Sequence, residues 1–99
     1  MIVVSGEFQI DPKDIDAARA AMIDMAAETA KEDGCIHYRF YQDIEHADRF
    51  HVYEEWESDA HLAAHAASAH MQVFRAALGA LNLISRNVKK MEAGSVTAL

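Results

Sequence analysis

Residues 49–57 have the sequence RFHVYEEWE, and this stretch decides the fold. Alternate residues of an extended strand share one face, and the face that runs from Phe50 to Trp56 is apolar except at Glu54. The opposite face carries His51, Tyr53 and Glu55. The pattern therefore predicts a strand with one side against a core and a second side of mixed character.

Three further strands are predicted around this one. Residues 36–41 alternate in the same way, and only a short polar connection, residues 43–48, separates the two stretches. So short a connection predicts an antiparallel hairpin. Residues 2–10 also alternate and are rich in β-branched side chains, while residues 82–92 carry the last apolar positions at strand spacing.

Helices are predicted between the strands. Asp11 is a capping residue and Pro12 suits the first helical position, so a helix should begin there and present its apolar stripe, Ile15 to Thr29, to the core. Gly34 should follow its end in a left-handed conformation. A second helical stretch should begin at residues 58–59 and continue to about residue 81, with a break near Ser68.

The resulting order, β-α-β-β-α-β, predicts an α+β fold of the ferredoxin-like kind. It contains a four-stranded antiparallel sheet with both helical stretches on one face. We expect a single domain over residues 1–99, with a core at about 2–92 and a tail at 93–99. The other sheet face, which bears Val3, Tyr53 and Glu55, is too apolar for plain solvation and predicts a homodimer that stacks two such faces.

Composition narrows the classes of function. The chain has 99 residues and a net charge of −7, which disfavours binding to nucleic acid. The single cysteine, Cys35, excludes an internal disulfide, and no base lies beside it in the sequence to make it a nucleophile. No apolar run is long enough to cross a membrane and no signal-peptide pattern is present, so we expect a cytoplasmic protein. Glycine-rich phosphate loops are also missing.

Glu54 is a candidate for proton chemistry. A carboxylate that faces a core has a raised pKa unless it is paired, and a raised pKa is typical of a general base. The alternative is a bracing residue that pairs with a helix N–H, a histidine or Arg39. His65 should project from the helix that covers this face, so we predict a buried Glu54–His65 pair that can exchange a proton.

The histidines offer two patterns. His65 and His70 flank the predicted break, which would turn both toward one pocket, although either could be an ordinary polar residue. His61 and His65 share a helix face, but the residues between them supply no further ligand, so no metal site is predicted.

Aromatic side chains should converge between sheet and helices, chiefly as core and partly as a wall that suits a flat aromatic ligand. They are Phe8, Tyr38, Phe40, Phe50, Trp56 and Phe74.

Together these residues resemble the antibiotic biosynthesis monooxygenase family over roughly residues 2–92. The resemblance rests on residues 32–35 (EDGC), on Tyr38, on the stretch from residue 43 to residue 56, and on the helical residues 62–74. It implies a dimeric α+β barrel with a cavity between helices and sheet in each subunit. The family's recurrent histidines match His65 and His70, with Ala69 in place of the usual proline, and its strand-end motif matches Glu54 and Trp56.

The resemblance implies a cofactor-independent monooxygenase that oxidises a small aromatic or quinol substrate with O2. The expected catalytic residues are His65, Glu54 and His70, and the expected substrate-binding residues are Phe8, Tyr38, Trp56 and Phe74. No flavin or metal is expected, and haem is disfavoured because Phe8 and Arg75 occupy the positions that the haem-degrading branch uses. Two alternatives stay open. One is an isomerase of a small hydroxy-ketone or dione, with or without a phosphate, for which Arg39, Arg75 or Arg86 would supply a cation; the other is a non-catalytic dimeric ligand-binding module.

Overall fold

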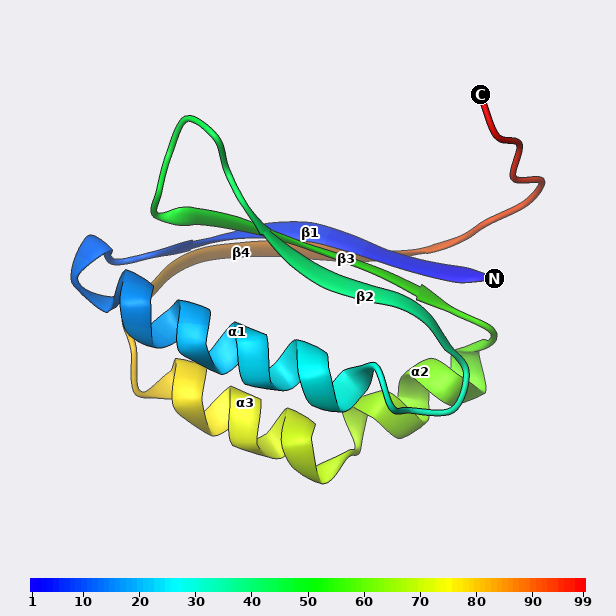
Figure 1. Ribbon diagram of the computed structural model, residues 1–99, viewed down its shortest axis with the longest axis horizontal. Coiled ribbons are helices and arrows are strands. Elements are labelled where there is room, and N and C mark those ends of the chain that lie inside the picture. The colour runs from blue at the N-terminus through cyan, green and yellow to red at the C-terminus, as the bar shows by residue number, and fades with distance from the viewer.

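One antiparallel sheet carries all of the helices on a single face (Figure 1). The computed structural model describes residues 1–99, and its element order is the β-α-β-β-α-β order that the sequence predicts. The elements are β1 (Ile2–Ile10), the 3-10 turn η1 (Pro12–Asp14), α1 (Ile15–Thr29), β2 (Cys35–Gln42), β3 (Arg49–Trp56), α2 (Asp59–Ala66), α3 (Ala69–Gly79) and β4 (Leu83–Glu92).

The strand order across the sheet is β2-β3-β1-β4, and every neighbouring pair is antiparallel. This confirms the ferredoxin-like α+β prediction. In the central pair, Phe8 lies opposite Phe50 and Val4 lies opposite Glu54. The register therefore places Glu54 on the helix-facing side, among the side chains that form the core.

The predicted alternation fails at one residue of β2. The pairing of β2 with β3 shifts register between Cys35 and His37, so Ile36 is left out of the ladder and is 51% exposed. A bulge of this kind adds one residue and resets the alternation after it. Tyr38 and Phe40 consequently face the helices without Ile36.

The predicted helix boundaries have identifiable causes. Asp11 accepts a hydrogen bond from the Lys13 backbone N–H and starts η1, so α1 itself begins only at Ile15. Gly34 has a φ of 78°, which turns the chain from the end of α1 into β2. The Ser68 hydroxyl accepts from the Met71 N–H and starts α3, which confirms the predicted break between α2 and α3.

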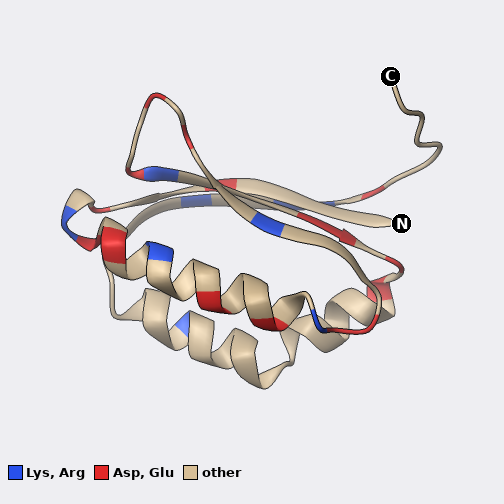
Figure 2. Cartoon of the chain, in the orientation of Figure 1, with Lys and Arg blue, Asp and Glu red and all other residues tan.

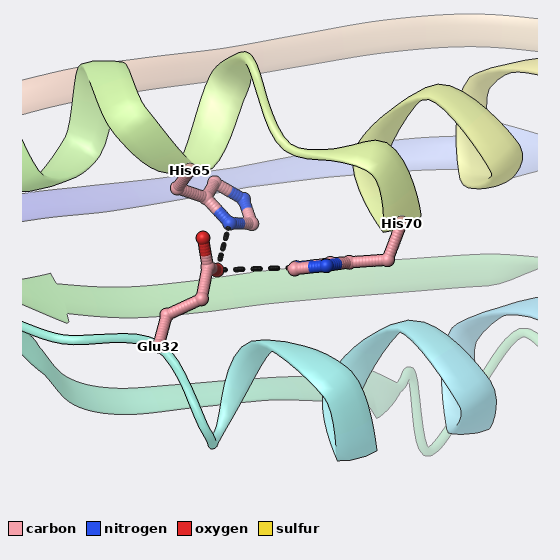
Figure 3. Close-up of side chains that lie close together, drawn as sticks. All are labelled: Glu32, His65 and His70. Atoms are coloured by element: carbon pink, nitrogen blue, oxygen red, sulfur yellow. Dashed lines mark hydrogen bonds and ion pairs between the residues drawn. The ribbon is translucent and has the colours of Figure 1, made fainter.

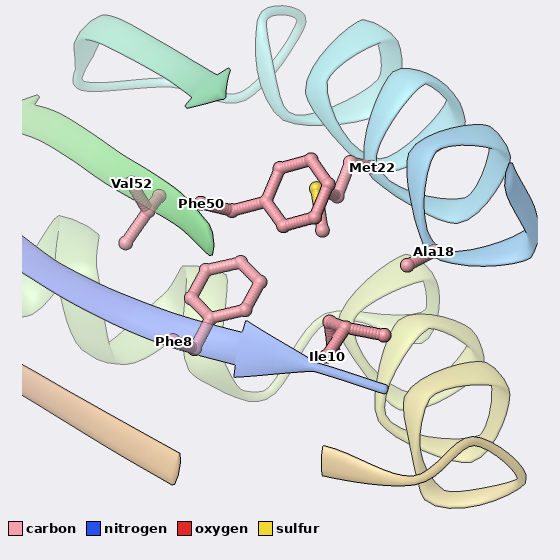
Figure 4. Packing of buried hydrophobic residues seen from close by; sticks show 6 residues of the cluster. All are labelled: Phe8, Ile10, Ala18, Met22, Phe50 and Val52. Carbon is pink, nitrogen blue, oxygen red and sulfur yellow. The ribbon is translucent and has the colours of Figure 1, made fainter. Parts of the chain in front are cut away.

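The core lies between the sheet and α1 (Figure 4). Its largest cluster comprises Phe8, Ile10, Ala18, Met22, Phe50 and Val52, and the Phe8 and Phe50 rings stack at 5.9 Å between centroids. A second cluster, Ile2, Val4 and Trp56, occupies the end of the sheet near α2. Each large apolar side chain buried here contributes about 1.5–3 kcal/mol to folding, so these clusters fix the sheet against the helices.

The outer sheet face carries polar side chains that form hydrogen bonds with one another. Ser5 Oγ lies 2.9 Å from His51 Nε2, and the Tyr53 hydroxyl donates to Glu55 at 2.8 Å. Beyond β4, the Ala93 N–H donates to the Met1 carbonyl and residues 94–99 lie exposed. None of the helices has the length and apolar character that a membrane crossing requires.

We predict that Gly6→Ala destabilises the protein by about 1–3 kcal/mol, because overpacking a tight contact costs energy of that order. A Cβ at Gly6 would overlap the Asn87 carbonyl oxygen and the Val88 Cα on β4. Gly79→Ala is the matched control, since no atom lies within 4 Å of a Cβ at that position. Urea unfolding measures both variants; equal free energies of unfolding for the two would contradict the close approach of β1 and β4.

Candidate active site

A cavity of about 330 Å³ lies between the sheet and the helices α2 and α3. Its walls are mainly apolar and include the predicted ligand-binding residues Phe8, Tyr38 and Phe74. Besides Tyr38, four ionisable side chains line it: Glu54, His65, Arg86 and Lys90. An apolar chamber with a few polar groups is the usual form of a small-molecule site.

His65 is held in place by Glu32 (Figure 3). The Glu32 side chain extends from the connection between α1 and β2, and its Oε2 lies 2.6 Å from His65 Nδ1. His65 is only 2% exposed and belongs to α2. A carboxylate beside Nδ1 favours the tautomer that carries its proton there, which leaves the Nε2 lone pair free to accept a proton.

His70 approaches the same carboxylate from the start of α3. Its Nε2 lies 3.2 Å from Glu32 Oε2, close enough for an ion pair, but the orientation does not satisfy a hydrogen bond and this nitrogen is otherwise buried and unpartnered. The His65 and His70 rings are 6.1 Å apart. The break at Ser68 thus brings both histidines to Glu32. However, His65 lines the cavity, whereas His70 lines a separate hollow between α1 and α3.

The predicted Glu54–His65 pair is not joined by a direct hydrogen bond. Glu54 Oε1 accepts from Trp56 Nε1 at 2.9 Å, two residues along the same strand face, while Glu32 occupies Nδ1 of His65. The two groups nevertheless line one cavity. Trp56 connects them indirectly, because its ring also packs on the His65 ring at 4.7 Å between centroids.

Trp56 has a different position from the one expected. It is fully buried in the core cluster with Ile2 and Val4 and does not line the cavity. Its large ring lies behind the polar groups instead of forming a wall for a ligand. Tyr38 is the aromatic residue that both contacts the His65 ring, at 5.3 Å, and lines the cavity.

Burial shifts the two cavity bases in opposite directions. Burial lowers the pKa of His65, and the Glu32 hydrogen bond only partly opposes this, so the imidazole is neutral at neutral pH. Burial raises the pKa of Glu54 to about 7, against the lowering effect of the Trp56 hydrogen bond. Burial also raises the pKa of the Tyr38 hydroxyl. The cavity therefore contains a neutral imidazole and a carboxyl group that changes charge near neutral pH.

The remaining candidates lie elsewhere. His61 Nδ1 lies 2.7 Å from Ser58 Oγ at the start of α2, so it is part of the helix cap. Burial raises the pKa of the Cys35 thiol, which disfavours the reactive thiolate. Arg39 lies opposite Tyr53 and so belongs to the outer sheet face, and Arg75 donates to the Ala66 carbonyl. Of the three arginines considered as cations for an isomerase, only Arg86 lines the cavity.

Glu32, His65 and His70 are also the donors most able to hold a metal ion, because their ligand atoms lie within 4.8 Å of one another. Two imidazoles and a carboxylate can bind Zn²⁺. When two ligand atoms bind the same tetrahedral ion, they lie roughly 3.3 Å from each other. The 2.6 Å between Glu32 Oε2 and His65 Nδ1 is instead a hydrogen-bond length. The geometry present is therefore that of a proton-sharing pair.

Glu32 is the site residue that sequence reasoning missed. It lies 33 residues from His65, and nothing in the local pattern distinguishes it from the neighbouring Asp33, which is almost fully exposed. Two signals were available: residues 32–35 carry part of the family resemblance, and the turn at Gly34 directs one of the two acidic side chains toward the helices.

We predict that Glu54→Gln makes stability less dependent on pH. The pKa of the Glu54 carboxyl is about 7 in the folded protein and 4.5 in the unfolded chain. The free energy of unfolding therefore falls as the pH rises from 4.5 through about 7. The variant should match the wild type near pH 5 and exceed its unfolding free energy by roughly 2–3 kcal/mol at pH 8. Glu55→Gln, on the outer face, is the control. A constant difference between Glu54→Gln and the wild type across this range would show that Glu54 is not desolvated.

Comparison with known proteins agrees with this fold. The antibiotic biosynthesis monooxygenase family model matches residues 1–77. A Deinococcus radiodurans structure, named for this kind of monooxygenase, superposes with a TM-score of 0.93 at 23% identity and covers 100% of this chain and 98% of that one. Rv0793 from Mycobacterium tuberculosis gives 0.88 at 26% identity, with 98% of both chains covered. A further structure named antibiotic biosynthesis monooxygenase gives 0.88 at 25% identity and covers 96% of this chain and 100% of that one.

A search of curated proteins finds no match. The family model alone spans more than half of the sequence, and the structural neighbours reproduce the fold from end to end. The chain belongs to the antibiotic biosynthesis monooxygenase family.

Proposed function

We propose that the protein is a cofactor-independent monooxygenase that oxidises a small aromatic or quinol substrate with O2. The observation that carries this proposal is the Glu32–His65 pair beside an aromatic-lined cavity. Family membership supports monooxygenase chemistry in general terms. The substrate class follows from the cavity, whose Phe8, Tyr38, Phe40 and Phe74 side chains suit a flat ring.

His65 is the proposed general base. A phenol must lose its proton before its ring can give an electron to O2, and a neutral imidazole accepts that proton near pH 7. Glu32 keeps the imidazole in the required tautomer and stabilises the imidazolium that forms, which is the task of the third member in a catalytic triad. His70 contacts Glu32 and not the cavity, so its proposed role is to position that carboxylate.

The proposed reaction consumes one O2 and releases one water. After His65 takes the hydroxyl proton, the phenolate transfers one electron to O2, and the two radicals combine to form a carbon–oxygen bond at the para carbon. The peroxide takes the proton back from His65 to give a hydroperoxide. Loss of the hydrogen on that carbon, with cleavage of the O–O bond, yields a quinone and water, so a C–H group is oxidised by four electrons as O2 is reduced.

Glu54 is proposed to assist this sequence from the cavity wall. One oxygen is held by the Trp56 N–H, while no protein group bonds the other. Because its pKa is about 7, Glu54 can take up or release a proton at little cost at neutral pH. It is suited to remove the carbon-bound hydrogen in the last step, when the quinone forms.

The isomerase alternative keeps one specific point in its favour. Arg86 and Lys90 line the cavity, and a phosphorylated hydroxy-ketone would need such cations. The non-catalytic alternative loses support, because the features that would favour it are a sealed pocket and a Glu54 held in a salt bridge. The cavity is open, and Glu54 bonds to Trp56 without a cationic partner.

We predict O2 uptake when the purified protein is given naphthols and quinols without added flavin, haem or metal. His65→Ala should lower turnover by more than roughly 10²-fold, the least expected for loss of a general base. Glu32→Gln should also lower turnover, because it removes the carboxylate beside His65, and it should leave the fold intact. His46→Ala, in the connection before β3, is the control.

An oxygen electrode and product mass spectrometry measure the reaction, and circular dichroism checks each fold. Full activity in His65→Ala would contradict the assignment of the base. Conversion of a dione or hydroxy-ketone without O2 consumption would favour the isomerase.

We also propose that the protein is a homodimer built by stacking the outer sheet faces that bear Val3, Tyr53 and Glu55. These residues are only half buried in a single chain, although the face has apolar and aromatic members.

Sedimentation equilibrium at micromolar concentration should give about twice the 11.0 kDa chain mass. Val3→Glu should shift the protein toward monomer, whereas Ile23→Glu, an equally apolar but exposed site on α1, should not. A wild-type monomer would contradict this proposal.

A further inference from the structure

The wall of the cavity formed by β4 is cationic. Arg86 lies opposite Phe8 and Lys90 lies opposite Val4, so both belong to the row of β4 that faces the helices. Figure 2 shows blue segments along β4, whereas α1 carries mainly red ones. This concentration of positive charge lies at the cavity in a chain whose net charge is −7.

Arg86 has no counter-ion. Lys90 Nζ contacts Asp59 Oδ1 at 3.0 Å, but no carboxylate lies within 4.0 Å of the Arg86 guanidinium and it makes no side-chain hydrogen bond. Glu54 is near enough to feel its charge yet bonds to Trp56. Arg86 is exposed at the edge of the chamber, so its five N–H donors are open to solvent, and their planar fork matches a carboxylate or phosphate.

We propose that Arg86 is the recognition site for an oxyanion group on the ligand, so that the preferred substrate is an aromatic acid, bound more tightly than a neutral ring of the same size. The aromatic part would occupy the chamber beside Phe8 and Phe74, and the carboxylate or phosphate would lie at β4. Lys90 adds positive potential but is partly neutralised by Asp59, so Arg86 dominates. This inference rests on the proposed function, because it uses the same cavity.

The anion would also fix the direction of the ligand. Arg86 and His65 line the same chamber, one from the sheet and one from α2. A ring held by its acidic group at β4 therefore presents its other end to the helices, where the proposed base lies. A neutral ring of the same size has no such constraint and could bind in several orientations.

A matched pair of fluorescent probes tests the proposal by direct binding. 8-Anilinonaphthalene-1-sulfonate carries a sulfonate, and N-phenyl-1-naphthylamine is the same ring system without it. Energy transfer from Trp56, the only tryptophan, reports on a bound probe. Arg86→Gln should weaken binding of the sulfonate probe at least tenfold and leave the neutral probe unchanged. Displacement by 1-naphthoate and by 1-naphthyl phosphate then distinguishes the two natural oxyanions.

Arg39→Gln is the control, because it removes one positive charge from the outer sheet face. It should leave both probes bound as in the wild type, and thermal melting confirms that each variant folds. Equal weakening in Arg86→Gln and Arg39→Gln, equal weakening of both probes, or failure of either probe to bind the wild type would overturn the proposal. Selective loss of the sulfonate probe in a protein without O2 uptake would uphold the anion site and reject the monooxygenase.

Discussion

Glu32 and His65 come from different elements, 33 residues apart, and meet at 2.6 Å inside the protein. The contact needs three structural conditions at once. The turn at Gly34 must direct the preceding residues back toward the helices, the Ser68 cap must end α2 just after His65, and α2 must pack on β3. Each condition arises from an ordinary local cause, namely a positive φ, a hydroxyl cap and the packing of the half-buried Leu62 on the core. Together they place the Glu32 carboxylate against Nδ1 of His65.

The carboxylates of Glu32 and Glu54 differ in their burial and in their hydrogen-bond partners. Glu32 bonds an imidazole at the back of the site, whereas Glu54 sits 6% exposed among Phe50, Val52 and Trp56 with only an indole N–H as donor. Desolvation without a cationic partner keeps the pKa of Glu54 near 7. The protein thus carries a desolvated carboxyl group in its cavity, which is the state that the proposed role of Glu54 in proton transfer requires.

Periodicity predicted the fold well because each element obeys a local rule. The alternation of residues 49–57 placed Glu54 on the inner face, and Ser68 and Gly34 marked the breaks where the structure has them. The errors arose where two distant segments meet. The bulge at Ile36 depends on how β2 pairs with β3, and the partner of His65 depends on which side chain the Gly34 turn delivers. Glu54 was assigned to His65 because both face the core, although facing the same space does not establish a hydrogen bond. Trp56, two residues away, was the nearer donor.

We infer that Glu32 fixes His65 as a neutral imidazole with its proton on Nδ1 and a free Nε2. Long-range ¹H–¹⁵N NMR correlation of the histidine rings tests it directly, with His65→Gln to assign the signals. At pH 7 the account predicts that His65 shows the Nδ1–H tautomer, and that its pKa lies below the ordinary histidine value and falls further in Glu32→Gln. A protonated Nε2 at pH 7, or a His65 titration unaffected by Glu32→Gln, would contradict the account.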